Sequence, residues 1–288
     1  MPSPTFLIPG ASRSGTTTLW SIIKQHPSIC LPKKKELRFF EKDKKYERGM
    51  DKYEKHFEYC KKNNEIGEAS TTYFEKGIRK DKDNSYIYDV DDDPAIRIKK
   101  NYPNIKLVIS LRNPIDRIYS QFYKNRKMGI EKEEDVMRAI KKEVGGKRSY
   151  KRDKCCWLYR NSYSLHIEKW LELFSRSQIK IIIFEEWINE KEKTANDLFE
   201  FLGVDRNVGI NVNKKKNVGK SVMSDRLAVL RRKYLSDTLL GELVSTINRS
   251  RGRPEPSKCE REWLFELLKD DINNLEHILD RSLKVWYL

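Results

Sequence analysis

The residues best suited to chemistry form a short loop near the N-terminus. An apolar run at residues 5–8 leads into the sequence Gly-Ala-Ser-Arg-Ser-Gly-Thr-Thr-Thr at residues 10–18. A buried strand, a glycine turn and a helix start together leave backbone N–H groups pointing at one place, where the helix dipole adds partial positive charge. The pattern therefore predicts a cradle for a phosphate group.

The loop lacks the lysine that nucleoside-triphosphatases place directly after the last glycine. Thr16 occupies that position, and the cation lies earlier in the loop, at Arg13. The apolar run at residues 105–111 ends at Arg112 rather than at an acidic residue suited to hold magnesium. ATP hydrolysis is therefore disfavoured, and the pattern favours a nucleotide whose charge is neutralised by arginine.

Two motifs in this order resemble the sulfotransferases that use 3'-phosphoadenosine 5'-phosphosulfate (PAPS). Residues 13–17 match the R/K-S-G-T-T pattern of the loop for the 5'-phosphosulfate, and residues 111–120 match the L-R-[DN]-P-x-x-R-x-x-S pattern of the 3'-phosphate segment. The resemblance covers nearly the whole chain and points to the soluble microbial and carbohydrate-type branch. It implies a single sulfotransferase domain over residues 1–288, with PAPS as sulfuryl donor and PAP as product.

The resemblance also implies which residues hold the donor. Arg112 leaves the end of a strand and Ser120 lies about two turns along the next helix, so both can face the 3'-phosphate. Arg13 can reach the bridging oxygen, where negative charge develops as the sulfuryl group leaves. In the family a basic loop from the region of residues 214–220 closes over the nucleotide, with a solvated loop as the alternative. The predicted donor-binding residues are Arg13, Ser14, Gly15, Thr16, Thr17, Thr18, Arg112, Ser120, Lys216 and Lys220.

Glu36 is the predicted general base, because an acceptor hydroxyl is a poor nucleophile until a base takes its proton. The glycan sulfotransferases that the chain resembles carry a glutamate with this role in the pattern E-x-[HQ]-F-F, which falls on residues 36–40. Arg38 replaces the usual His or Gln, which leaves the orientation of the acceptor open. The alternative is that Glu36 is a solvated charge in a lysine-rich loop.

The acceptor site is predicted to contain Glu36, Arg38, Glu68 and Ser70, with a purely structural role as the equal alternative for the last two. Ala69 stands where several glycosaminoglycan-modifying relatives carry lysine, which argues against a heparan-like acceptor. The expected reaction is in-line transfer of a sulfuryl group from PAPS to a hydroxyl or amine. The expected acceptor is a glycan or a small molecule.

Composition and net charge limit which other classes of function are plausible for this chain. The 288 residues carry a formal net charge of +16 and are 38% hydrophobic, with a mean hydropathy of -0.77, as in a globular protein with one sizeable core. The charge raises the alternative of a nucleic-acid-binding protein, but the lysines are scattered and this function does not explain the loop at residues 10–18. A P-loop phosphotransferase is the other alternative. We therefore expect no nucleic-acid partner, and the oligomeric state stays open.

The cysteines and histidines point to a reduced, metal-free protein. The five cysteines, Cys30, Cys60, Cys155, Cys156 and Cys259, are odd in number and lack metal-site spacing, so reduced thiols in the cytoplasm are expected. The four histidines form no spaced cluster, so no metal is expected. We also expect no membrane span, since no apolar run has the required length, and no signal peptide.

Strands and helices alternate along the chain, which is typical of a parallel sheet covered on both faces. The resemblance and this alternation predict an α/β fold of the three-layer P-loop type, with a central, mostly parallel sheet flanked by helices. The expected strands are residues 5–9, 29–31, 66–68, 107–111 and 180–184, and the expected helices are residues 18–23, 46–61, 114–126, 163–174, 194–202 and 264–279, with a loop or short insertion at residues 81–93.

Overall fold

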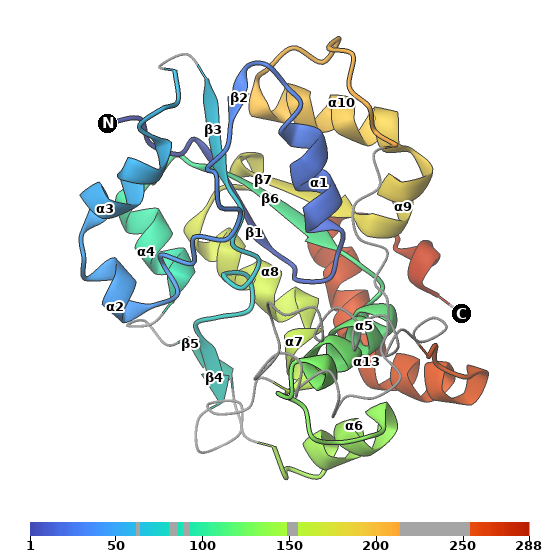
Figure 1. Ribbon diagram of the computed structural model, residues 1–288. Helices are drawn as coiled ribbons and strands as arrows, with labels where there is room; N and C mark the ends of the chain where they lie inside the picture. Colours follow the sequence, from blue (N-terminus) through green and yellow to red (C-terminus); the bar gives the residue numbers. More distant parts are fainter. Residues whose placement is uncertain (62–63, 81–85, 89–92, 149–154, 214–253, 288) are drawn as a thin grey trace, which may run out of the picture. The chain divides into compact units, whose positions relative to one another are not determined.

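The computed structural model describes residues 1–61, 64–80, 86–88, 93–148, 155–213 and 254–287 (Figure 1). The chain divides into two compact units. The first comprises Met1–Asn113 and Ser164–Lys216, and the second comprises Pro114–Tyr163 and Asn217–Leu288. The expectation of a single domain stays a prediction.

The first unit is built on a five-stranded parallel sheet with the strand order β2-β3-β1-β6-β7. Every residue of the central strand β1 is buried, as expected for a strand covered on both faces. The fold class predicted from the sequence is confirmed. The strands are β1 (Phe6–Gly10), β2 (Ile29–Cys30), β3 (Glu65–Glu68), β6 (Lys106–Leu111) and β7 (Ile179–Ile183).

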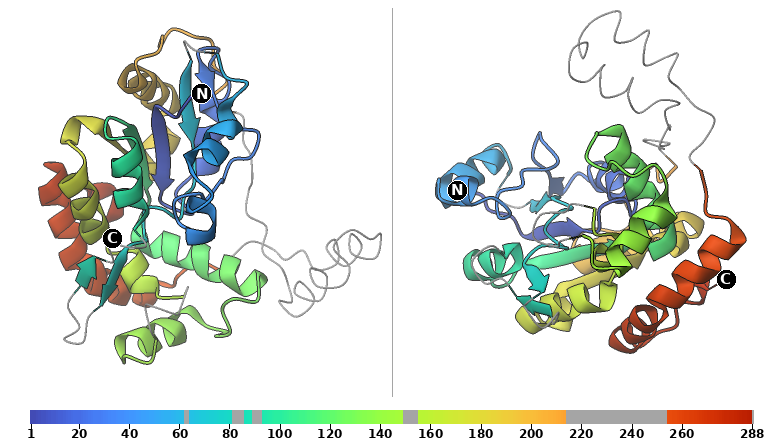
Figure 2. Two further views of the ribbon diagram at one scale, coloured as in Figure 1. Left: turned by 90° about the vertical axis from the view of Figure 1, so that its left-hand side faces the viewer. Right: turned by 90° about the horizontal axis from the view of Figure 1, so that it is seen from below.

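Helices lie on both faces of this sheet (Figures 1 and 2). On one face, helices α1 (Thr16–Ile23) and α10 (Lys191–Leu202) pack their apolar side chains against Phe6, Ile8 and Val108. Because side chains alternate along a strand, the residues between these point to the other face. Helices α4 (Pro94–Asn101) and α8 (Tyr163–Leu173) lie on that side.

Shorter elements complete the first unit. They are α2 (Asp43–Tyr46), α3 (Met50–Glu54), the 3-10 helices η1 (Lys55–Phe57) and η3 (Arg176–Gln178), α9 (Phe184–Asn189), and the antiparallel pair β4 (Ile78–Lys80) and β5 (Tyr86–Tyr88). The single helix expected at residues 46–61 is therefore wrong, because the chain is interrupted at Gly49, whose φ of 85° ends one helical segment before the next begins. Residues 86–88, expected in a loop, instead form β5.

The described part of the second unit is helical. Its elements are α5 (Pro114–Lys127), α6 (Val136–Val144), α7 (Trp157–Arg160), α13 (Lys258–Leu279) and the 3-10 helix η4 (Lys284–Trp286). Helix α13 begins with a capping box between Ser257 and Glu260, and it buries the whole predicted apolar stripe of residues 264, 268, 272, 275 and 279. The C-terminal helix predicted from this stripe is confirmed.

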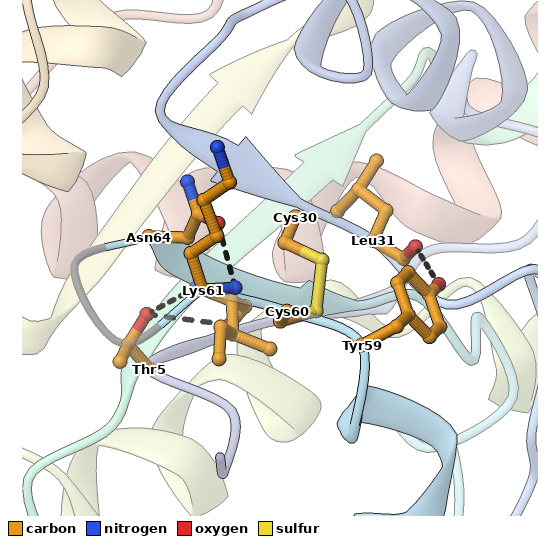
Figure 3. Close-up of a disulfide and its surroundings, with 8 residues drawn as sticks. Thr5, Cys30, Leu31, Tyr59, Cys60, Lys61 and Asn64 are labelled. Carbon is orange, nitrogen blue, oxygen red and sulfur yellow. Dashed lines mark hydrogen bonds between the residues drawn. A yellow bond between two sulfur atoms is a disulfide. The ribbon is translucent and has the colours of Figure 1, made fainter.

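A disulfide joins Cys30 and Cys60, with their Cα atoms 5.7 Å apart (Figure 3). The expectation that all five cysteines are reduced is therefore wrong. The pairing follows from the sheet: β2 lies beside β3, so the segment that returns to β3 brings Cys60 next to the end of β2. The neighbouring Tyr59 hydroxyl donates to the Leu31 carbonyl at 2.5 Å.

The disulfide also bears on the expected compartment. Disulfides persist mainly in oxidising compartments. Reduced thiols therefore no longer support a cytoplasmic location, which stays a prediction. Within the described ranges, every helix is too short or too polar to cross a membrane.

Loss of the disulfide should destabilise the first unit. Replacing Cys30 and Cys60 together by serine should lower the free energy of unfolding by about 3 kcal/mol, because the bond closes a loop across a sequence separation of 30. Urea unfolding of the oxidised protein and the variant measures this difference. Cys259→Ser is the control, since Cys259 is exposed and outside the bond.

Thiol labelling tests the same bond directly. Alkylation of the unfolded, unreduced protein should modify three cysteines, and labelling of all five would contradict the pairing.

Candidate active site

The predicted phosphate loop joins the carboxyl end of β1 to α1. Arg13 and Gly15 have φ values of 73° and 77°, which turn the chain sharply between the two elements. The loop is tied to the neighbouring strand β6, because the Ala11 N–H donates to the Ser110 carbonyl at 2.8 Å and the Ser110 hydroxyl donates to the Ser14 carbonyl at 2.6 Å. Successive residues in such turns form a concave set of N–H groups that binds anions.

Gly15 is required in this loop for two reasons. A Cβ atom there would lie 2.5 Å from the Phe184 ring and 2.9 Å from the Trp187 ring, and the positive φ disfavours any other residue. Gly15 is also the N-cap of α1, and the structure describes no side-chain cap at this position. The first-turn N–H groups of α1 therefore point toward the space that an anion would fill.

Lys35 adds a cation to this loop. Its Nζ donates to the Thr17 hydroxyl at 3.1 Å and to the Thr16 hydroxyl at 3.4 Å. Lys35 is one of three consecutive lysines, and nothing in the sequence pattern distinguishes it from its neighbours, so this contact could not be predicted from the sequence. Its position directly before Glu36 links the phosphate loop to the segment that carries the predicted base.

Glu36 lies next to this contact with its side chain 31% exposed. Arg38 donates to Glu36 Oε2 from Nε at 3.1 Å and from Nη2 at 2.8 Å. The Thr71 hydroxyl donates to Glu36 Oε1 at 3.3 Å. The carboxylate is thus oriented by two neighbours and still reaches solvent.

The backbone that follows Glu36 is held by side chains from the end of β3 and from the segment after it. The Leu37 N–H donates to Glu68 Oε1 at 3.3 Å, the Arg38 N–H to Ser70 Oγ at 2.8 Å, and the Phe39 N–H to Tyr73 Oη at 2.9 Å. All three side chains are buried, and the Ser70 hydroxyl also donates to Glu68. The place of Glu68 and Ser70 in the acceptor site stays a prediction, while their observed contacts fix the segment that carries the predicted base.

Burial raises the pKa of Glu68 from its usual 4.5 to about 7. The hydrogen bonds from Ser70 and from the Leu37 N–H favour the ionised form and limit this rise. Glu68 therefore titrates close to neutral pH while it holds the backbone of Leu37.

The residues predicted for the 3'-phosphate lie in different parts of the structure. Arg112 follows β6 in the first unit, and its guanidinium stacks on the Phe184 ring at 5.0 Å from the centroid. Ser120 is buried on α5 in the second unit. Their joint role stays a prediction. Lys216 and Lys220 lie outside the described residues.

Comparison with known proteins identifies the family. Residues 3–281 match the sulfotransferase domain model. The chain belongs to the sulfotransferase family. The resemblance inferred from the two motifs is thus confirmed, and PAPS, the expected donor, is the donor of this family.

The curated relatives of this family member are longer proteins. The membrane-associated sulfotransferase kil1 of Dictyostelium discoideum is 32% identical over 123 residues, which cover 42% of this chain and 22% of that protein. The bifunctional heparan sulfate N-deacetylase/N-sulfotransferase 1 of Mus musculus is 24% identical over 98% of this chain and 30% of its own length. The chain therefore spans less than a third of these two relatives.

Solved structures share the fold. The sulfotransferase from Alicyclobacillus acidocaldarius matches with a TM-score of 0.71 and 24% identity, over 100% of both chains. A mouse sulfotransferase complexed with PAP matches with a TM-score of 0.50 and 17% identity, over 95% of this chain and 85% of that chain. These two structures therefore share the fold that is described for this chain.

Glu68 should make stability depend on pH. Its pKa in the folded protein is higher than the usual value, so the folded state favours the protonated form, and stability is lost as the pH rises from about 4.5 through 7. Glu68→Gln keeps an acceptor for the Leu37 N–H but removes this titration. Relative to wild type, the variant should gain on the order of 3 kcal/mol of unfolding free energy between pH 4.5 and pH 8.

Urea unfolding at several pH values measures this difference. Glu58→Gln, which removes an exposed carboxylate of the same unit, serves as the control. Curves for wild type and Glu68→Gln that stay parallel across the whole pH range would contradict the assignment.

Proposed function

We propose that this protein transfers a sulfuryl group from PAPS to a hydroxyl or amine of an acceptor, with Glu36 as general base. The observation that carries the proposal is the contact of Lys35 with Thr16 and Thr17, since it brings the segment of Glu36 against the phosphate loop. The phosphate loop and the candidate base Glu36 thus lie next to each other within one compact unit. A glycan is the acceptor class that we favour, because relatives named for heparan sulfate match most of the chain.

The residues of the phosphate loop fit the 5' end of the donor. An uncapped helix start, the sharp turn made by Arg13 and Gly15, and the Lys35 ammonium together suit a phosphosulfate. PAPS, when bound, supplies the sulfuryl group and a phosphate leaving group. Arg13 and Lys35 would stabilise the negative charge that develops on the bridging oxygen.

Glu36 would take the proton of the acceptor as the new bond to sulfur forms and the bond to the bridging oxygen breaks. Its carboxylate is partly exposed, so an acceptor can reach it, and Thr71 holds one of its oxygens. The hydrogen bonds of Leu37, Arg38 and Phe39 to the end of β3 and the segment after it keep this carboxylate in one place. Such positioning lowers the entropic cost of reaching the reactive geometry.

The 3'-phosphate should decide nucleotide affinity. The protein should bind PAP far better than AMP, because Arg112 is proposed to hold the 3'-phosphate. Arg112→Ala should remove most of the difference, on the order of 2 to 3 kcal/mol for a charge-assisted contact. Titration calorimetry with both nucleotides measures it.

Arg206→Ala is the matched control for Arg112, because Arg206 is an exposed arginine of the same unit. Equal affinity of the wild-type protein for PAP and AMP would remove the main support for a PAPS site.

Glu36 should control turnover without controlling nucleotide binding. Glu36→Gln keeps the size of the side chain and removes the base, so transfer from labelled PAPS should fall by roughly 10² to 10⁴-fold while PAP affinity stays unchanged. Label transfer to an acceptor, read by mass, gives the rate, and calorimetry gives the affinity.

Two further variants are compared with Glu36→Gln. Glu47→Gln, an exposed carboxylate further along the same segment, should keep normal turnover. Arg13→Ala should lower both turnover and PAP affinity, because Arg13 lies in the phosphate loop itself. Near-normal turnover of Glu36→Gln would mean that Glu36 is a surface charge.

A further inference from the structure

Arg38 has an unusual backbone that fixes its side chain beside the proposed base. Its φ is 53°, in the left-handed region that residues other than glycine rarely adopt. The Arg38 N–H bond to Ser70 and the neighbouring bonds of Leu37 and Phe39 hold this conformation. The fold therefore maintains a strained residue at one position, and strain of this kind often marks a functional residue.

The Arg38 guanidinium forms an ion pair with Glu36, and sulfuryl transfer must weaken this ion pair. Two of its donors, Nε and Nη2, share Glu36 Oε2. When Glu36 accepts a proton from the acceptor, Arg38 loses its nearer carboxylate and keeps the longer ion pair with Glu41, whose Oε1 lies 3.8 Å from Arg38 Nε. The donors that Glu36 held can then bind another anion, and the side chain of Arg38, which is 40% exposed, can turn toward a bound molecule.

Positive charge is concentrated around this pair. Residues 33–45 contain seven lysine or arginine residues and three carboxylates. Each carboxylate already has a partner, since Glu36 is bound by Arg38, Glu41 by Thr72 and Asp43 by Arg97. The segment therefore has a surplus of positive charge close to the proposed base.

The lysine cluster packs against the segment of Glu36 itself. Lys45 donates from Nζ to the Leu37 carbonyl. Burial lowers the pKa of Lys45, and the neighbouring charges of Lys42 and Lys34 lower it further, so these ammonium groups lie close enough to repel one another. Such repulsion is relieved when an anion binds among the cations.

We propose that the acceptor carries a carboxylate or sulfate group near the hydroxyl or amine that is sulfated, and that Arg38 leaves Glu36 to bind this group. The inference rests on the proposed function, because it assigns Glu36 the role of base. The covalent step is unchanged: the acceptor oxygen or nitrogen bonds to sulfur, the bond from sulfur to the bridging oxygen breaks, and the acceptor proton passes to Glu36. Arg38 exchanges one ion pair for another, so an acidic acceptor releases the base that acts on it.

Matched glycan pairs test this proposal. One pair is a hyaluronan oligosaccharide and its carboxyl-reduced form, and the other is a sulfated galactan oligosaccharide and its desulfated form. The affinity of each is measured by calorimetry with PAP bound, and sulfuryl transfer is measured with labelled PAPS. The pair that shows the preference tells whether a carboxylate or a sulfate is recognised.

The wild-type protein should bind an acidic member at least about tenfold more tightly than its neutral partner. Arg38→Gln should abolish this preference, with no loss in binding of the neutral form. The related glycan pattern carries Gln or His at this position, so the variant should fold, and unchanged PAP affinity verifies that it does. Arg48→Gln, an exposed arginine outside the cluster, should keep the preference within about twofold.

Three results would overturn the proposal: no preference in the wild-type protein, a preference that survives Arg38→Gln, or an equal loss in Arg48→Gln. Failure of the proposed function looks different, since it would appear as absent PAP binding or as absent transfer to every glycan. Where PAP binds and transfer is absent, the acidic and neutral affinities, which are compared without turnover, still test the role of Arg38.

Discussion

The arrangement of the candidate site depends on three hydrogen bonds from consecutive backbone N–H groups. Leu37, Arg38 and Phe39 donate to the buried side chains of Glu68, at the end of β3, and of Ser70 and Tyr73, in the segment after it. Buried polar groups are costly unless they are paired, so these bonds leave the segment little freedom. The position of Glu36, the left-handed backbone of Arg38 and the reach of Lys35 all follow from this attachment.

The parallel sheet brings these segments together. The phosphate loop follows β1, the segment of Glu36 follows β2, and the side chains that hold this segment lie at the end of β3 and just after it. Because these three strands are neighbours and run in the same direction, the segments leave the same edge of the sheet. Ligand sites in open α/β sheets lie at this edge for the same reason.

The segment that carries Glu36 is attached at both of its ends. The Cys30–Cys60 disulfide lies at its start, where β2 ends, and the bonds of residues 37–39 lie beyond Glu36 (Figure 3). Between these attachments lie Lys33, Lys34 and Lys35, which are part of the positive charge of this region. The structure thus combines a fixed backbone with the partly exposed side chains of Glu36 and Arg38.

The family and the fold could be predicted because both depend on local patterns. The loop at residues 10–18, the strand ending at Arg112 and the apolar stripe of α13 are each contiguous or periodic in the sequence. Gly49 shows where local patterns fail as predictors. This one residue with positive φ divides a stretch whose composition predicts a helix.

The sequence by itself determined the alternating strands and helices, the phosphate loop and membership of the sulfotransferase family. Each of these depends on residues that are close together in the sequence. Only the tertiary structure decided that Lys35 joins the phosphate loop, that Glu68 holds Leu37 and that Cys30 bonds Cys60. These contacts join residues 18, 31 and 30 positions apart. Sequence spacing carries no signal for such pairs, because the order and register of the strands decide which distant segments meet.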